Sequence, residues 1–198
     1  MELDRPSRAR PARAHIAYLY RDEREHREVV RSFVHAGLAA RERVVYIADV
    51  ADDERLDAAL VDFGILPVDD ADRDRLIALP APAAYCPDHR FDPDTTLERV
   101  RDDYRLGRTG ELTGTRIAGD MGWATTGVAG SERLMEYERR LDDLLARFPM
   151  TVLCQYDMTR FDGATAFATL GVHPMLLMDG RIVRNPYVDG VRARSARK

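Results

Sequence analysis

Five short runs rich in β-branched and aromatic residues recur along the chain, and each is followed by an amphipathic stretch. The runs lie at 15–20, 43–49, 75–81, 115–121 and 151–157. In the stretches between them, apolar residues recur at the three- and four-residue spacing of a helix. This alternation predicts βαβ units. We therefore expect an α/β fold of three layers, in which helices cover both faces of a mostly parallel sheet.

The C-terminal part of the chain departs from this pattern. The segment PMLLMDGRIVRNPYV (174–188) has two short apolar runs on either side of Asp179-Gly180. An Asp-Gly pair between such runs is a strong signal of a tight turn, so we predict a C-terminal β-hairpin. Arg184, Asn185 and Tyr187, at its end, could close a pocket or support a dimer edge.

Length and composition predict one domain in a chain of 198 residues. We place it at 14–188, between basic flexible tails at 1–13 and 189–198. The net charge of −4 argues against nucleic acid as a direct partner. No apolar run approaches the roughly 20 residues that cross a bilayer, and the N-terminus lacks an apolar signal segment. Two cysteines are too few for a disulfide scaffold, which favours a cytoplasmic protein.

The junction YLYRDEREHREVV (18–30) lies where many α/β proteins hold a phosphate. A phosphate loop needs GxxxxGK(S/T), in which glycines let backbone N–H groups approach the phosphate and a lysine reaches its charge. No glycine occurs between His15 and Gly37, and the only lysine is Lys198. The acidic residues at 22, 23 and 25 would repel a phosphate. The sequence therefore argues against conventional ATP hydrolysis, and we expect no nucleotide cofactor.

Several strings of the sequence carry a family resemblance. They are HIAYLYRDEREH, RVVYIAD, LPAPAAYCPDHRFDP, GDMGWA, SERLMEYERRLDDLL, LCQYD and RNPY. In this order and at these spacings they resemble the MEDS domain, the sensory domain of methanogen and methylotroph regulators of the DcmR type. The order of elements also resembles KaiC-like and RecA-like ATPases, whose phosphate loop is missing here, and the MEDS family itself resembles KaiC-type proteins without that loop. The resemblance implies a sensory or regulatory role, with small hydrocarbon derivatives as possible signals.

Ligands of open parallel sheets bind beyond the carboxyl ends of the strands. There, Met121 and Trp123 offer an apolar wall, and the 81–92 loop is long enough to act as a lid. The expected ligand-binding residues at this edge are Tyr18, Tyr20, His26, Asp49, Tyr85, Asp120, Met121, Trp123, Gln155, Tyr156 and Asp157. Of these, Tyr20, Asp120, Trp123 and Tyr156 are expected to line the site directly.

Other interpretations of these residues stay open. Tyr18 also suits a core position, and His26 is one helical turn from Asp22, as in a surface contact. Asp49 and Asp120 could bind ligand groups or cap helices. If they lie close together, one would carry a raised pKa.

No metal site is expected from local spacing. Cys86 and His89 form a CxxH pair, but a metal needs three or four ligands in one place. His15 starts its strand at the end opposite the proposed site and is expected to be structural. Cys154 is expected to be a small buried residue. No nucleophile–base pair can be identified, so no catalytic residue is assigned.

These features together predict a non-catalytic sensory domain that binds a small organic molecule and acts on another regulatory protein chain. A homo-oligomer is compatible with this prediction. Two alternatives remain at this stage. The first is an interaction protein of a kinase or sigma-factor pathway that binds no ligand. The second is a hydrolase or metal-dependent enzyme that uses Asp49 and Asp120.

Overall fold

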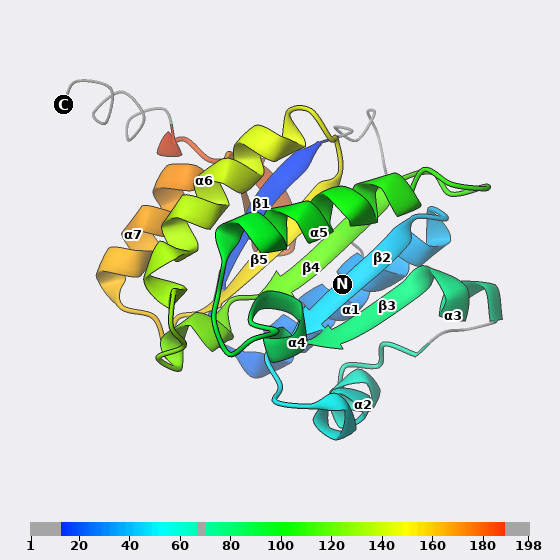
Figure 1. Ribbon diagram of the computed structural model, residues 1–198, viewed down its shortest axis with the longest axis horizontal. Helices are drawn as coiled ribbons and strands as arrows, with labels where there is room; N and C mark the ends of the chain where they lie inside the picture. The colour runs from blue at the N-terminus through cyan, green and yellow to red at the C-terminus, as the bar shows by residue number, and fades with distance from the viewer. Residues whose placement is uncertain (1–12, 67–69, 189–198) are drawn as a thin grey trace.

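The computed structural model describes residues 13–66 and 70–188. The predicted basic tails lie outside the described residues, except Arg13, which donates to a side-chain oxygen of Asp142 at 3.0 Å. One seven-stranded sheet has the order β3-β2-β4-β5-β1-β6-β7 (Figure 1). Its strands are β1 (Ala14–Tyr20), β2 (Arg43–Ala48), β3 (Leu76–Pro80), β4 (Thr115–Asp120), β5 (Thr151–Asp157), β6 (Met175–Met178) and β7 (Arg181–Arg184).

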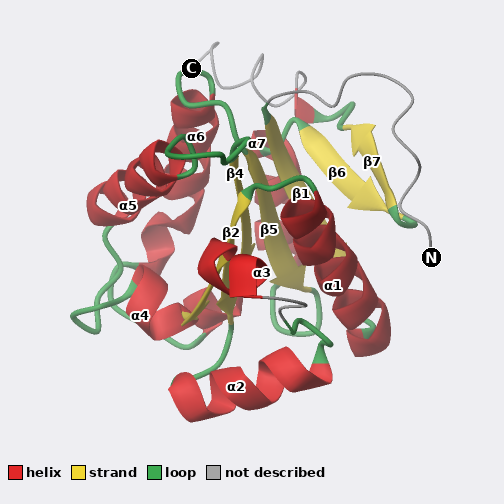
Figure 2. Cartoon of the chain, turned by 90° about the vertical axis from the view of Figure 1, so that its right-hand side faces the viewer, coloured by secondary structure: helices red, strands yellow, loops and turns green. Residues whose placement is uncertain are grey.

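Helices cover both faces of the sheet, as predicted. The α-helices are α1 (Glu23–Ala39), α2 (Asp53–Asp62), α3 (Asp70–Arg75), α4 (Ala81–Tyr85), α5 (Pro93–Leu106), α6 (Leu134–Leu145) and α7 (Gly163–Val172), and short 3₁₀ turns are η1 (Gly122–Thr125) and η2 (Ser131–Arg133). Apolar residues of α1 and α2 pack on one face. Those of α4, α5 and α6 pack on the other. Figure 2 shows the sheet between α1 and the α5–α6 pair.

The sequence signals at the helix starts agree with the structure. Asp22 caps α1, and its side chain accepts a hydrogen bond from the N–H of Glu25 at 2.8 Å. Asp52 caps α2 in the same way, with Arg55 N–H as the donor at 3.0 Å. A side-chain oxygen that accepts from the first turn satisfies an N–H group that lacks a partner within the helix. In α1 this carboxylate takes the position that an anion would occupy in a phosphate-binding protein.

Two helices were not anticipated. The 81–92 segment, predicted as a loop, begins with α4, and α3 precedes β3. Pro82 stands in the first turn of α4, where its missing N–H costs nothing. The consequence is that Tyr85 is a buried helical residue rather than part of an open lid.

The C-terminal hairpin forms as predicted. Asp179 and Gly180 both have positive φ, at 48° and 71°, which is the geometry of a tight two-residue turn. β6 pairs parallel to β1, and β7 pairs antiparallel to β6. The sheet is therefore parallel except at this edge. Among the described residues, no helix has the length and apolar character needed to span a membrane.

Candidate functional site

The sheet divides the predicted site residues between its two faces. Tyr18 and Tyr20 lie with the α1 face, and His26 reaches the same region from α1. On the opposite face, the core beneath α4, α5 and α6 contains four predicted residues, namely Tyr85, Met121, Trp123 and Tyr156. The expected arrangement, in which Tyr20 and Asp120 share one site with Trp123 and Tyr156, is therefore not what the structure shows.

Four predicted residues do meet, and we call Tyr20, His26, Asp120 and Gln155 the carboxyl-edge cluster. The Tyr20 hydroxyl donates to Asp120 Oδ2 at 3.1 Å. His26 Nε2 lies 2.7 Å from Gln155 Oε1 and 4.0 Å from Asp120 Oδ2. The rings of Tyr20 and His26 stack with centroids 3.9 Å apart. The four side chains thus form one continuous buried polar network.

Local structure explains this convergence. β4 and β5 are parallel neighbours, and Asp120 stands opposite Gln155 in their register. β1 is the other neighbour of β5, so Tyr20 ends beside them. α1 starts directly after β1, which places His26 one turn into the helix and over the strand ends.

Burial sets the charge states of the cluster. It raises the pKa of Asp120 from 3.8 to about 7, with a further contribution from the nearby carboxylate of Asp49. Burial also lowers the pKa of His26, because it disfavours the imidazolium form. It raises the pKa of Tyr20, and Asp120 adds to that effect. Near neutral pH the Asp120 carboxyl group can therefore either donate or accept a hydrogen bond.

Arg160 is the main residue of this edge that the sequence argument missed. Its guanidinium pairs with Asp49 and donates to Gly122 O at 2.8 Å and Thr125 Oγ1 at 2.9 Å. A β-carbon at Gly122 would overlap the side-chain ends of Asp49 and Arg160, so a larger residue there would displace this ion pair. The feature of the sequence that could have indicated Arg160 is its position three residues after β5, at the edge where ligands of such sheets bind.

Beside this ion pair the surface is hollowed. The hollow has a volume of about 390 Å³ and is bordered by η1, η2 and the start of α7. Its lining residues are Ala124, Thr125, Ser131, Glu132, Leu134, Met135, Arg160, Phe161, Asp162 and Thr165. Arg160 and Thr125 therefore connect the hollow with the carboxyl edge of the sheet.

The aromatic residues on the opposite face form tight core packing. The Tyr85 and Trp123 rings stack at 5.1 Å, and Phe91 lies 4.6 Å from Trp123. A β-carbon at Gly119 would overlap the Tyr85 hydroxyl, so β4 is glycine where that ring crosses it. Met121 is buried in the same cluster. These side chains fill the space beneath α4 and α5.

The two remaining predicted residues lie next to the carboxyl-edge cluster. Tyr18 is buried and stacks on Tyr20 with ring centroids 5.5 Å apart. Asp157 ends β5, where one carboxylate oxygen accepts from the N–H and the hydroxyl of Thr159 at 2.8 and 2.7 Å. Tyr18 thus supports the cluster, and Asp157 shapes the turn that leads to Arg160.

A second polar cluster lies on the other face of the sheet, and we call His15, Glu138, Cys154 and His173 the buried cluster. All four residues have no exposed surface. One carboxylate oxygen of Glu138, Oε2, lies 3.1 Å from His15 Nε2, 3.4 Å from His173 Nε2 and 3.5 Å from Cys154 Sγ. The other, Oε1, accepts from the Tyr156 hydroxyl at 2.6 Å. Tyr156, predicted as a ligand-binding residue, therefore serves this cluster.

The ionisable groups of the buried cluster shift one another's pKa. Burial raises the pKa of Glu138, but the neighbouring His173 and His15 outweigh it and hold that pKa below its usual range. Burial lowers the pKa of His15, whereas the carboxylates of Asp142 and Glu138 raise it to a greater extent. For His173, burial and the proximity of His15 lower the pKa. Glu138 is thus ionised, with His15 as its better-placed cationic partner.

The buried cluster is also the group in the described part of the chain that has metal-binding composition. One ligand atom from each of the four residues lies within 4.8 Å of the others. The CxxH pair behaves differently, since Cys86 is buried, His89 is exposed, and neither belongs to a group of three or more ligands among the described residues.

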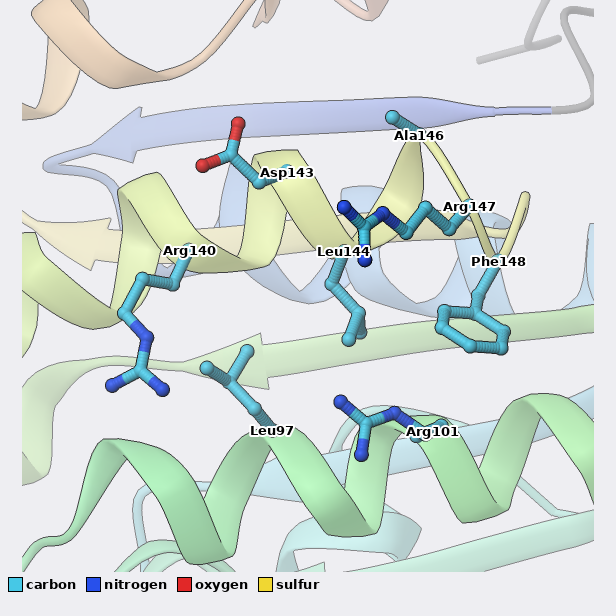
Figure 3. A pocket seen from close by; sticks show the side chains of 8 residues that line it. All are labelled: Leu97, Arg101, Arg140, Asp143, Leu144, Ala146, Arg147 and Phe148. Carbon is cyan, nitrogen blue, oxygen red and sulfur yellow. The ribbon is translucent and has the colours of Figure 1, made fainter.

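A hollow of about 520 Å³ lies between α5 and α6, away from the predicted residues (Figure 3). Leu97 and Leu144 point toward each other across it, with arginines around them. Its lining residues are Leu97, Arg101, Arg140, Asp143, Leu144, Ala146, Arg147 and Phe148. None of the predicted site residues lines it.

Comparisons with known proteins agree with this fold. Residues 14–174 match the family described as MEthanogen/methylotroph, DcmR Sensory domain (MEDS). A KaiC-like protein from Pyrococcus horikoshii OT3 superposes with a TM-score of 0.54 at 10% identity, over 84% of this chain and 70% of that one. The flagellar accessory protein FlaH from Methanocaldococcus jannaschii gives 0.56 at 12% identity, over 86% and 76%. No curated protein sequence matches the chain.

Proposed function

The chain belongs to the MEDS family of sensory domains, and from this premise we propose that it is a non-catalytic sensor. In this proposal a small organic molecule binds at the carboxyl-edge cluster and the adjoining hollow. Binding changes the surface around η1 and the β5–α7 turn, which another regulatory protein chain reads. The KaiC/RecA-like scaffold supplies the position of the site.

The observation that carries the proposal is the state of Asp120. Its carboxyl group is buried at the carboxyl edge, bonded to Tyr20 and close to His26, with no arginine or lysine hydrogen-bonded to it among the described residues. An acid held near its midpoint of protonation can match either a donor or an acceptor on a small ligand. Sites for small organic molecules combine a few polar groups of this kind with apolar surface, which Leu134, Met135 and Phe161 supply in the adjoining hollow.

The N-terminus of α1 supports a ligand other than nucleotide. The Asp22 side chain already accepts a hydrogen bond from a first-turn N–H group, that of Glu25, and Glu23 and Glu25 add negative charge. In a nucleotide-binding relative of this fold, the same helix end would face phosphate. A neutral or cationic organic molecule is compatible with the acidic character of this edge, whereas a triphosphate is not.

Signalling in this proposal is a shift between two states of the edge. The contacts of Arg160 join Asp49 on the β2–α2 turn to η1, so a ligand that displaces or strengthens them favours one arrangement of both segments. The size of the response is limited by the ligand's difference in affinity for the two states.

The experiment is a thermal-shift screen of the full chain with short alcohols, amines, halogenated alkanes, ATP–Mg²⁺ and divalent ions. We expect a concentration-dependent rise in Tm with one class of small organic molecule, because binding to the folded state raises its apparent stability. Asp120→Asn should abolish the shift, whereas Asp57→Asn, on the exposed side of α2, should retain it.

Two outcomes would overturn the proposal. A Tm shift with ATP–Mg²⁺ that Asp120→Asn removes would favour an enzyme that uses Asp49 and Asp120. The absence of any shift across the organic panel, together with binding of a regulatory protein that Asp120→Asn leaves unchanged, would favour an interaction protein without a ligand.

A further inference from the structure

We propose that the buried cluster is a site for one divalent transition-metal ion, with Zn²⁺ as the ion that its donors suit best. The ligands are the imidazoles of His15 and His173, the thiolate of Cys154 and the carboxylate of Glu138. The proposal is independent of the sensory site, because the two clusters lie on opposite faces of the sheet.

The distances between the donor atoms fit a tetrahedral ion. Zinc ligands at about 2.0–2.3 Å and tetrahedral angles lie roughly 3.3–3.8 Å from one another. Glu138 Oε2 is 3.1, 3.4 and 3.5 Å from its three neighbours, and Cys154 Sγ is 3.6 Å from His15 Nε2. Four of the six edges of the tetrahedron therefore already have nearly the required length.

An unpartnered nitrogen points into the same space. His173 Nδ1 lies 2.9 Å from the carbonyl oxygen of Thr169, and a carbonyl can only accept, so Nδ1 carries the proton. In the neutral ring the lone pair is then on Nε2, which is fully buried and has no hydrogen-bond partner. That lone pair faces the Glu138 carboxylate at 3.4 Å. Two acceptors in contact need a proton or a metal ion between them, and only a metal ion meets this need for all four residues at once.

Charge balance leads to the same ion. When the metal binds, the Cys154 thiol releases its proton to solvent and the sulfur lone pair forms the metal–sulfur bond. Thiolate and carboxylate then carry two negative charges, and a divalent cation with two neutral imidazoles neutralises them. Among the described residues, Glu138 forms ion pairs only with histidines, and no arginine reaches it.

The surroundings orient the ligands as expected around a metal. Tyr156 binds Glu138 Oε1 at 2.6 Å and leaves Oε2 for coordination. The other nitrogen of His15, Nδ1, lies 3.7 Å from Asp142 Oδ1, which places a second carboxylate at ion-pair distance from this ring but not at hydrogen-bond distance. Asn185 donates to the carbonyl oxygen of His173 at 2.7 Å and fixes the end of α7.

The test is metal analysis of the reduced full chain, purified without chelating resin, followed by titration of the metal-free chain with Co²⁺. We expect about one equivalent of zinc per chain and, with cobalt, intense visible bands of a tetrahedral site plus a thiolate-to-cobalt charge-transfer band. Cys154→Ser should remove the charge-transfer band and weaken Co²⁺ binding by at least about tenfold. The matched control is Cys86→Ser, which changes the other buried cysteine and should retain both.

Because Cys154 and His173 are both fully buried, circular dichroism first checks that Cys154→Ser and a second variant, His173→Gln, are folded, and His35→Gln serves as the control for His173→Gln. Loss of tetrahedral cobalt bands in His173→Gln alone supports the site. The proposal is overturned if the folded wild-type chain contains no transition metal and takes up no Co²⁺, since the cluster is then only a proton-linked ion pair. It is equally overturned if Cys86→Ser, rather than Cys154→Ser, removes the charge-transfer band.

Discussion

The two polar clusters lie back to back across β5, which contributes Gln155 to one and Cys154 to the other. They differ in the charge state of their buried acid. In the carboxyl-edge cluster, the acid of Asp120 has its pKa raised toward neutrality, so a proton removes its charge. In the buried cluster, Glu138 remains ionised among histidines. Asp120 lies at the end of β4, next to the turn that carries Gly122, whereas Glu138 is held between β1, β5, α6 and α7, where an ionised group needs a fixed partner.

The largest effect on stability is expected for Glu138→Gln, which removes the ionised acid of the buried cluster. Breaking a buried ion pair by removing one partner typically costs about 3–5 kcal/mol, because the other partner is left without compensation. We expect a loss of this size in the free energy of unfolding, measured by urea denaturation at pH 7. Glu98→Gln, on the exposed side of α5, should change it by less than about 0.5 kcal/mol. Equal effects of the two variants would show that Glu138 is not an ionised partner.

The second prediction concerns pH and separates the two clusters. Asp120 has a folded-state pKa of about 7 against an ordinary 3.8. The folded chain therefore holds this proton more tightly, so the contribution of Asp120 to stability is complete below about pH 4 and is lost as pH rises through 7. In Asp120→Asn this contribution is absent. The stability difference between wild type and variant should change by on the order of 3 kcal/mol between pH 4 and pH 8.

Taking the difference between wild type and variant reduces the opposite contribution of His26, whose lowered pKa makes the folded state gain stability as pH rises. The measurement is urea denaturation at a series of pH values. Asp57→Asn, on the exposed side of α2, serves as control and should change the free energy of unfolding by less than about 0.5 kcal/mol. A flat difference for Asp120→Asn would show that its carboxyl group is ionised over this whole range and that the contrast between the clusters does not exist.

Much of the fold followed from local signals. The strand runs, the Asp22 cap and the Asp179-Gly180 turn depend on residues close in sequence, so pattern and chemistry suffice for them. α3 was missed because DADRDR has no apolar periodicity. α4 was missed because five residues that begin with Ala-Pro look like a loop.

The sites were harder to predict because they depend on faces and on distant partners. Side chains alternate along a strand, so Gln155 and Tyr156 point to opposite faces of the sheet. The prediction that both line one site considered only that they lie at the same strand end. His15 and Glu138 are 123 residues apart, and only the crossing of α6 over β1 and β5 brings them together. No local spacing could have indicated the buried cluster, and His15 was therefore predicted only to have a structural role.

A smaller effect is expected for Asp22→Ala, which tests whether α1 positions only one of the clusters. Loss of an N-cap costs about 1 kcal/mol. Asp52→Ala removes the matching cap of α2 and should cost about the same in urea denaturation. Only the change at Asp22 should alter the NMR titration of His26, because α1 carries that ring over the strand ends. A similar change of the His26 titration in both variants would show that the environment of His26 does not depend on the capping of α1.

The smallest effect on stability, and the most selective one, is expected for Arg160→Gln. Its ion pair with Asp49 is partly exposed, so breaking it should cost only about 0.5 kcal/mol. Arg160 also lowers the pKa of Asp120, although burial dominates, so its removal should move the Asp120 titration seen by NMR to higher pH. Arg24→Gln removes an exposed i,i+4 pair on α1 and should leave that titration unchanged. If Arg160→Gln also leaves it unchanged, Arg160 is only a surface contact, and the charge of Asp120 is set by the protein interior alone, as in the buried cluster.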